Sequence, residues 1–325
     1  MSIQFLGMIG HRLSSETIAP AGPVFDRDYI VRFAQTHEAA GFDRLLVGHW
    51  SDQPDGFLVT ALAGLSTEKI NFLLAHRPGF VSPTLAARKF ATLEHLLGGR
   101  LAVHIISGGN DAEQRRDGDY LNHDERYART DAFLDTVRKV WTAEQPVDID
   151  NDFYQAEQAW SAIRPLQQPH IPIYFGGSSE AAIAVAGKHA DVFALWGESL
   201  GQTAETIRRV RAEAAKHQRH IDFSVSFRPI IADSEAQAGR RPSIFYMSLP
   251  NGRRRRARVS KRSQTAKGHG ACGPRQNREM WWINVCGPVL RNWLAAAITP
   301  PRWSERRNRL PMRCWIITTS GCATS

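Results

Sequence analysis

Short apolar runs alternate with longer helical patterns over the first 231 residues, and this alternation constrains the fold most. Seven runs are rich in β-forming residues, namely Ile3–Ile9, Arg44–Gly48, Ile70–His76, Leu101–Ser107, Ile171–Gly176, Val192–Trp196 and Phe223–Ile231. Helical patterns lie between them, at Asp26–Ala40, Phe57–Leu65, Pro83–Leu97, Glu125–Trp141, Ser179–Lys188 and Thr203–His217. Such alternation is typical of consecutive βα units that build a parallel sheet.

The regular spacing of these units favours a (β/α)8 barrel of the TIM type, of which seven strands are recognisable. An open, doubly wound sheet is the alternative, but the chain has no early G-x-G-x-x-G loop. Ser82 followed by Pro83 predicts a helix start, and Gly41 and Gly98 predict helix ends. The segments Val147–Asp150 and Phe153–Ala156, joined at Asn151-Asp152, predict a hairpin between the fourth helix and the fifth strand.

Charge and composition change abruptly near Gly239. Residues 240–325 hold 18 of the 41 Lys and Arg residues, two of the 32 acidic residues and all four cysteines, which gives them a charge of +16 against −7 for residues 1–239. No aspartate and no repeating apolar face occur there. We therefore predict a barrel domain over 1–239 and a basic, disordered or frameshifted tail over 240–325. A frameshift would remove the eighth strand and leave little activity.

The start of the chain lacks a basic segment followed by an apolar core, and no apolar run approaches the roughly 20 residues needed to span a bilayer. These features predict a cytoplasmic protein with no membrane partner. The first 239 residues have no cysteine, and the tail has no C-x-x-C pair, so no metal site is expected.

Two glycine-rich segments end predicted strands and could bind a ligand. Tyr174-Phe-Gly-Gly-Ser-Ser179 precedes a helix, where backbone N–H groups, hydroxyls and the helix dipole favour an anion such as a phosphate. A simple helix cap is the equally plain interpretation. His104-Ile-Ile-Ser-Gly-Gly-Asn110 ends another strand, where its polar groups could contact a flat heterocycle or only form a turn. In His123-Asp-Glu-Arg-Tyr127, Asp124 could cap a helix, and Tyr127 could project back toward the end of the barrel where the strands end.

Longer stretches resemble a known family. The segments 75–88 (AHRPGFVSPTLAAR), 91–100 (ATLEHLLGGR) and 117–127 (DGDYLNHDERY) are similar to those of two-component alkanesulfonate monooxygenases, which belong to the bacterial-luciferase superfamily. The match continues through Tyr174–Ser179 and Leu195-Trp-Gly-Glu198 and covers about residues 1–238.

The resemblance implies a barrel that binds reduced FMN at the carboxyl ends of its strands. It implies a flavin phosphate near Gly177, Ser178, Ser179 and Tyr127, with Ser107 and His123 along the ring and ribityl parts. His11, Trp196 and Arg228 would then face the substrate. It also implies a separate NAD(P)H-dependent flavin reductase as partner, and it leaves open whether the enzyme is a homo-oligomer.

Two departures from the family bear on the substrate. Gln53 stands where the sulfonate enzymes usually have a cysteine, and Ser226-Phe-Arg228 replaces their Arg-Leu-His motif. Arg228 still supplies a cation that could pair with an anionic head group.

The resulting hypothesis is an oxidoreductase that uses reduced FMN and oxygen to oxygenate a small organic substrate. The expected substrate is an alkanesulfonate, which the reaction would convert to an aldehyde and sulfite. Two alternatives stay open. A flavin-independent barrel hydrolase or aldolase could use His104, His123 and a carboxylate. The tail could instead bind nucleic acid nonspecifically, because arginines neutralise phosphates and aromatic side chains stack on bases.

Overall fold

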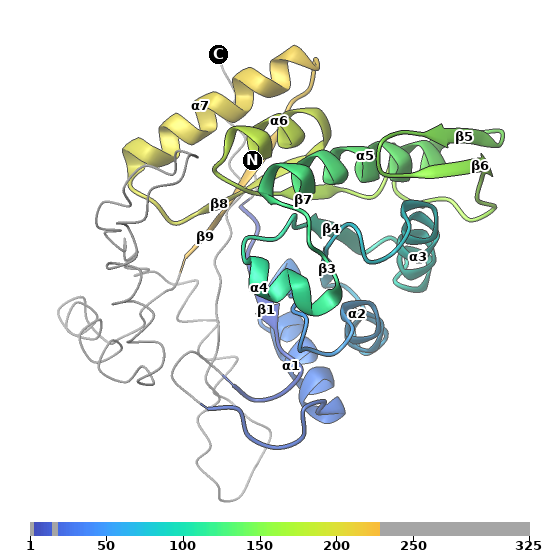
Figure 1. The fold of residues 1–325 in the computed structure, drawn as a ribbon. Helices are drawn as coiled ribbons and strands as arrows, with labels where there is room; N and C mark the ends of the chain where they lie inside the picture. Colours follow the sequence, from blue (N-terminus) through green and yellow to red (C-terminus); the bar gives the residue numbers. More distant parts are fainter. Residues whose placement is uncertain (1–2, 15–18, 228–325) are drawn as a thin grey trace, which may run out of the picture.

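The computed structural model describes residues 3–14 and 19–227, which form one parallel sheet covered by helices (Figure 1). The strands of this sheet are β1 (Leu6–Ile9), β2 (Arg44–Val47), β3 (Asn71–His76), β4 (Leu101–Ile105), β7 (Ile173–Phe175), β8 (Val192–Trp196) and β9 (Asp222–Ser226). The main helices are α1 (Arg27–Ala39), α2 (Gly56–Leu65), α3 (Pro83–Leu96), α5 (His123–Thr142), α6 (Glu180–His189) and α7 (Leu200–Lys216). All seven predicted strands and all six predicted helices are therefore present.

The sheet has the strand order β1-β2-β3-β4-β7-β8-β9, and each neighbouring pair is parallel. This order follows the chain, as in a barrel, whereas a doubly wound sheet reverses direction at a switch point. Within residues 3–14 and 19–227, β1 and β9 stand at the two ends of the order and do not pair with each other. The prediction of an incomplete seven-stranded barrel is confirmed. The predicted tail over 240–325 lies outside the described residues.

Alternate residues of the strands point to two different cores. The larger core packs strand residues such as Phe72, Val103 and Phe193 against the helices. The smaller core lies on the opposite, concave face and contains Leu6, Leu73, Ala102, Tyr174 and Val192. Burial on both faces explains why these strands read as continuous apolar runs.

Several helix ends agree with their predicted signals. Gly41 and Gly98 have φ angles of +79° and +61°, which suit glycine at a helix end. Ser82 is the N-cap residue of α3, although its side chain makes no capping hydrogen bond.

The prediction that Asp124 caps α5 is wrong. Asn122 is the N-cap, its side chain accepts from the backbone N–H groups of Asp124 and Glu125, and Glu125 accepts in return from Asn122. This capping box moves the start of α5 to His123. A second capping box at Ser199 starts α7 at Leu200, three residues before the predicted start.

The predicted hairpin is present as β5 (Val147–Asp150) and β6 (Gln155–Ala159), which pair antiparallel. Its second strand begins later than predicted, because the Asn151 side chain accepts from the N–H groups of Phe153 and Tyr154 and holds them in the turn. The hairpin projects beyond the end of α5 (Figure 1). One further element was not predicted, a short helix α4 (Asp111–Gln114) that runs into a single 3-10 turn, η1 (Arg115–Asp117).

Candidate active site

The candidate site lies where the parallel strands end. Because all seven strands run in the same direction, the segments that follow them lie at one edge of the sheet. His11 follows β1, Ser107 follows β4, the segment 176–179 follows β7, and Trp196 is the last residue of β8. Arg228, predicted to face the substrate, lies outside the described residues.

The loop after β7 approaches its neighbours closely. A Cβ atom at Gly176 would lie 2.7 Å from the carbonyl oxygen of Ala194, and one at Gly177 would lie 2.5 Å from the Cβ of Ala182. Only glycine fits at these contacts. The sequence predicted close backbone approach to a ligand, and the structure gives at least part of the reason as packing against β8 and α6.

Helix α6 begins directly after these glycines. Ser179 is its N-cap, and its side chain accepts from the N–H of Ala182 at 3.1 Å. The N–H groups before Ala182 have no partner within the helix, since the first turn of a helix has no preceding carbonyls. Glu180 is negative but pairs with Arg209 of α7. Ser178 is exposed beside this helix end. The arrangement suits a phosphate or another anion.

Tyr127 of α5 joins this loop. Its hydroxyl oxygen lies 3.0 Å from the position of a Cβ at Gly177, and its side chain hydrogen-bonds to Ser179. Burial raises the pKa of Tyr127, so the phenol stays protonated and can donate a hydrogen bond at neutral pH. The structure thus brings together four of the predicted cofactor residues, Tyr127, Gly177, Ser178 and Ser179.

His123 is the first residue of α5 and is exposed, with its ring 4.8 Å from that of Tyr127. Its Nδ1 lies 2.6 Å from the carboxylate of Asp124. His123 is therefore next to the loop after β7 through Tyr127, and its side chain is exposed to solvent. Its place along the ring or ribityl part of a flavin stays a prediction.

Ser107 occupies a more closed position than predicted. Its side chain is buried, and its Oγ lies 2.9 Å from the hydroxyl of Thr130 on α5. Thr130 donates to the carbonyl of Arg126, so the Ser107 hydroxyl donates to Thr130. Its own oxygen still has room to accept a hydrogen bond.

His11 lines a cavity at the ends of β1 and β2. Its lining combines apolar and polar side chains. The described residues beside His11 are Met8, Ile9, Gly10, Ser14, Tyr29, Phe33, Val47, Gly48, Trp50, Gln53, Pro54 and Val59. Burial and the nearby Arg12 lower the pKa of His11, against a smaller opposite effect of Asp52, so the ring is neutral at pH 7. The cavity brings His11 and Gln53 together. Trp196, which is 59% exposed at the end of β8, is not part of its lining.

His104, named for the hydrolase alternative, faces the concave side of the sheet in register with Tyr174. Burial lowers the pKa of His104 to about 4, and its Nδ1 has no hydrogen-bond partner among the described residues. Its ring is therefore neutral at pH 7, and the hydrogen bond that the structure gives it is with the backbone of Tyr174 rather than with a carboxylate. A pKa this low makes His104 a weak base, so this position gives the hydrolase alternative little support.

Sequence reasoning missed an ion-pair network that joins the loops. Arg77, which follows β3, is almost fully buried and donates to Glu113 of α4 at 2.6 Å, with Asp117 at 3.7 Å. Arg129 pairs in the same way with Asp119 at 2.6 Å. The signal was present as four acidic residues in the segment 108–122, namely Asp111, Glu113, Asp117 and Asp119, but spacing alone does not show which arginines they meet.

One cluster has the residue types of a metal site. Asp131 and Asp135 of α5 and His189 of α6 could offer ligand atoms within 4.8 Å of one another. The ammonium of Lys188 already lies 2.9 Å from Asp131 and 2.6 Å from Asp135. We therefore interpret this cluster as an ion-pair network between two helices.

Comparisons with known proteins agree with this geometry. Residues 3–283 match the family model of luciferase-like monooxygenases, a match that continues past the predicted boundary at residue 239. The chain belongs to the luciferase-like monooxygenase family. The recognition made from the sequence is therefore confirmed. Within the described residues no helix is long and apolar enough to cross a membrane.

Solved structures share the fold. A riboflavin lyase, solved with a modified FMN and riboflavin, has a TM-score of 0.69 at 22% identity, over 77% of this chain and 67% of the other. The EDTA monooxygenase of Chelativorans sp. BNC1 has a TM-score of 0.69 at 19% identity, over 81% of this chain and 72% of the other. A long-chain alkane monooxygenase has a TM-score of 0.67 at 18% identity, over 77% of this chain and 70% of the other. At these identities the likeness concerns the fold and not the substrate.

Proposed function

We propose that this chain is a reduced-FMN-dependent monooxygenase that oxygenates a small organic substrate. The observation that carries the proposal is the loop after β7, where Gly177, Ser178 and Ser179 start α6 and meet the hydroxyl of Tyr127. This loop offers backbone donors, hydroxyls and the positive end of a helix dipole to a phosphate. Membership of the luciferase-like family, and the modified FMN in the riboflavin lyase structure, support FMN as the ligand that carries this phosphate.

The residues fit FMN in distinct ways. The start of α6 and Tyr127 would hold the phosphate, and Ser107 would accept a hydrogen bond on the ring side. When bound, reduced FMN supplies the activation of oxygen. The protein would orient it, and the aliphatic and aromatic side chains around His11 would limit the access of water to the substrate. His11, neutral at pH 7, is able to accept a proton there.

We propose that the substrate is an alkanesulfonate, which the enzyme converts to an aldehyde and sulfite. The described lining of the His11 cavity contains no lysine or arginine. Its aromatic and aliphatic side chains suit an alkyl chain, so selectivity for a sulfonate then depends on Arg228. A separate NAD(P)H-dependent reductase would supply reduced FMN as the partner protein.

A coupled assay tests this function. The chain, and a second version that carries the other reading frame after Gly239, are each combined with a flavin reductase, NADH, FMN and hexanesulfonate, with hexyl methyl sulfide as the uncharged comparison. We expect hexanesulfonate-dependent sulfite release by the second version and much less by the chain as written. Faster turnover of hexyl methyl sulfide than of hexanesulfonate would support the monooxygenase activity and reject the alkanesulfonate as its substrate. Oxygen uptake that equals the reductase-only control with both substrates and both versions would reject the monooxygenase.

A further inference from the structure

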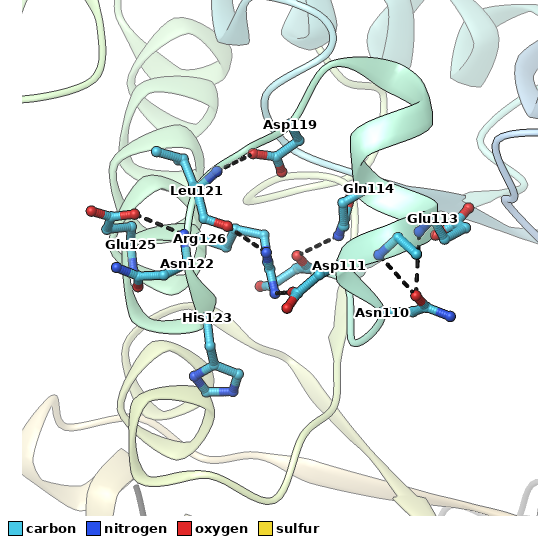
Figure 2. Close-up of polar contacts among 12 residues, drawn as sticks. Asn110, Asp111, Glu113, Gln114, Asp119, Leu121, Asn122, His123, Glu125 and Arg126 are labelled. Carbon is cyan, nitrogen blue, oxygen red and sulfur yellow. Dashed lines mark hydrogen bonds and ion pairs between the residues drawn. The ribbon is translucent and has the colours of Figure 1, made fainter. Parts of the chain in front are cut away.

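Helix α4 lies between two parts of the site, and its adjacent residues Glu113 and Gln114 reach in different directions (Figure 2). Glu113 accepts from the backbone N–H of Ser51 at 2.8 Å with one carboxylate oxygen, and from Arg77 at 2.6 Å with the other. Ser51 belongs to the loop between β2 and α2. A single carboxylate thus joins the segments that follow β2, β3 and β4.

Gln114 points away from Glu113 and contacts the segment that follows β4. It is fully buried, and its Nε2 donates to the carbonyl oxygen of Ser107 at 3.0 Å. The amide lies directly over Gly108, where a Cβ atom would be only 1.2 Å from Nε2. Gly108 also has a φ of +87°, so two independent reasons favour glycine there. The position of Ser107 therefore depends on Gln114.

Helix α4 is fixed by contacts that involve neither of these two side chains. Asn110 caps it by accepting from the N–H groups of Ala112 and Glu113. Asp111 pairs at 2.7 Å with Arg126 of α5, which also donates to the carbonyl oxygen of Leu121 (Figure 2). A four-residue helix is too short to be stable alone, so these anchors give it a defined place.

We propose that Glu113 is a positioning residue for the substrate side of the site, and that Gln114 is its counterpart for the cofactor side. Glu113 holds the loop that carries Trp50 and Gln53 into the His11 cavity, while Gln114 holds Ser107. This inference rests on the proposed function, which makes the cavity the substrate site and Ser107 part of the flavin site.

The energetics favour a firm link at Glu113. The Arg77 side chain is 4% exposed and the Glu113 side chain 18% exposed, so the pair is poorly screened by water. Burial would raise the pKa of Glu113, but the hydrogen bonds from Ser51 and Arg77 outweigh it and lower that pKa. The carboxylate is charged at neutral pH. Hydrogen bonds to charged groups contribute roughly 1.5–3 kcal/mol, which corresponds to about 10- to 100-fold in a local opening equilibrium.

The test separates the two side chains by their effects in the full chain. Glu113→Ala removes both contacts, Glu113→Gln keeps an acceptor for Ser51 without the charge, and Gln114→Met removes the donor to Ser107 at similar volume. Glu205→Gln, in an exposed i,i+3 pair with Arg208, is the control. For each variant we would measure amide hydrogen exchange of the peptide that contains Ser51, and the Kd for reduced FMN.

We expect Glu113→Ala to accelerate exchange around Ser51 by at least about tenfold while the Kd for reduced FMN stays within about twofold. Glu113→Gln should fall between Ala and the parent. Gln114→Met should raise the Kd at least about fivefold and leave exchange around Ser51 unchanged. Equal effects of both variants on both readouts, or no effect on either, would overturn the proposal. If the parent chain does not bind reduced FMN, the proposed function fails, and this inference fails with it.

Discussion

The hydroxyl of Tyr127 on α5 contacts the loop after β7. We expect Tyr127→Phe to weaken reduced-FMN binding by roughly fivefold, the equivalent of one ordinary hydrogen bond. The ring stays in place against Phe175, so the free energy of unfolding should change little. Titration of reduced FMN and urea unfolding measure the two quantities. An unchanged Kd would remove Tyr127 from the site.

Gly177 and Gly201 offer a matched pair of glycines. A Cβ at Gly177 meets Ala182 at 2.5 Å, whereas a Cβ at Gly201 in α7 has nothing within 4 Å. Gly177→Ala should therefore destabilise the protein by about 1–3 kcal/mol through overpacking. Gly201→Ala should be neutral or stabilise by up to about 1 kcal/mol, because alanine is the better helix former. Urea midpoints check both, and equal midpoints for the two variants would contradict the close packing of this loop.

At the scale of the elements, α5 and α6 are joined by the network of Asp131, Asp135, Lys188 and His189. Burial would raise the pKa of Asp131, but hydrogen bonds from His189 and Lys188 outweigh it and lower that pKa to about 2. Burial lowers the pKa of His189, so we treat Lys188 as the charged partner and His189 as a neutral donor at 2.7 Å.

This network predicts a pH dependence of stability. A carboxyl whose pKa is lowered on folding stabilises the fold above its unfolded pKa and loses that effect as pH falls through its folded pKa. For Asp131 the loss runs from about pH 4 to about pH 2. Asp131→Asn should lower the free energy of unfolding at pH 7 by about 1 kcal/mol, a value limited by the exposure of the carboxylate. The difference from the parent should vanish near pH 2, and a difference that does not depend on pH would contradict this role.

The elements show how far the sequence leads. Strands such as β4 and β8 were predicted closely, because they are buried on both faces and read as continuous apolar runs. The starts of α5 and α7 were misplaced, because Asn122 and Ser199 form capping boxes that outweigh the apolar period. Helix α4 was missed, because four residues have no period and one of its anchors, the pairing of Asp111 with Arg126 of α5, cannot be read from spacing.

The candidate site was predictable to a similar degree. The sequence named the loop after β7 as a candidate, although a simple helix cap explains glycine and serine between a strand and a helix equally well. The engagement of the Ser107 hydroxyl by Thr130 was not predicted, because only the packing of α5 against β4 brings the two together. The same holds for the cavity around His11 and Gln53, whose walls come from two strands and two helices.

For the whole molecule, the division at residue 239 stays a prediction. The change of charge and the loss of periodicity predict that limited proteolysis leaves a fragment of residues 1 to about 240. The family match that reaches residue 283 makes this a sharp test. Mass spectrometry of the stable fragment decides it, and a fragment that extends to 283 or beyond would show that the barrel domain continues past the predicted boundary.

The central claim is that the start of α6 holds the phosphate of reduced FMN, and one anaerobic titration tests it most directly. Reduced FMN is titrated into the parent chain, Ser178→Asp and Ser178→Ala, with urea unfolding as the control for folding. Ser178 is exposed, so both variants should fold like the parent. We predict saturable one-to-one binding by the parent, an affinity at least about tenfold weaker for Ser178→Asp because its charge opposes the phosphate, and a much smaller loss for Ser178→Ala. Equal affinity of Ser178→Asp and the parent, or no saturable binding by the parent, would contradict the claim.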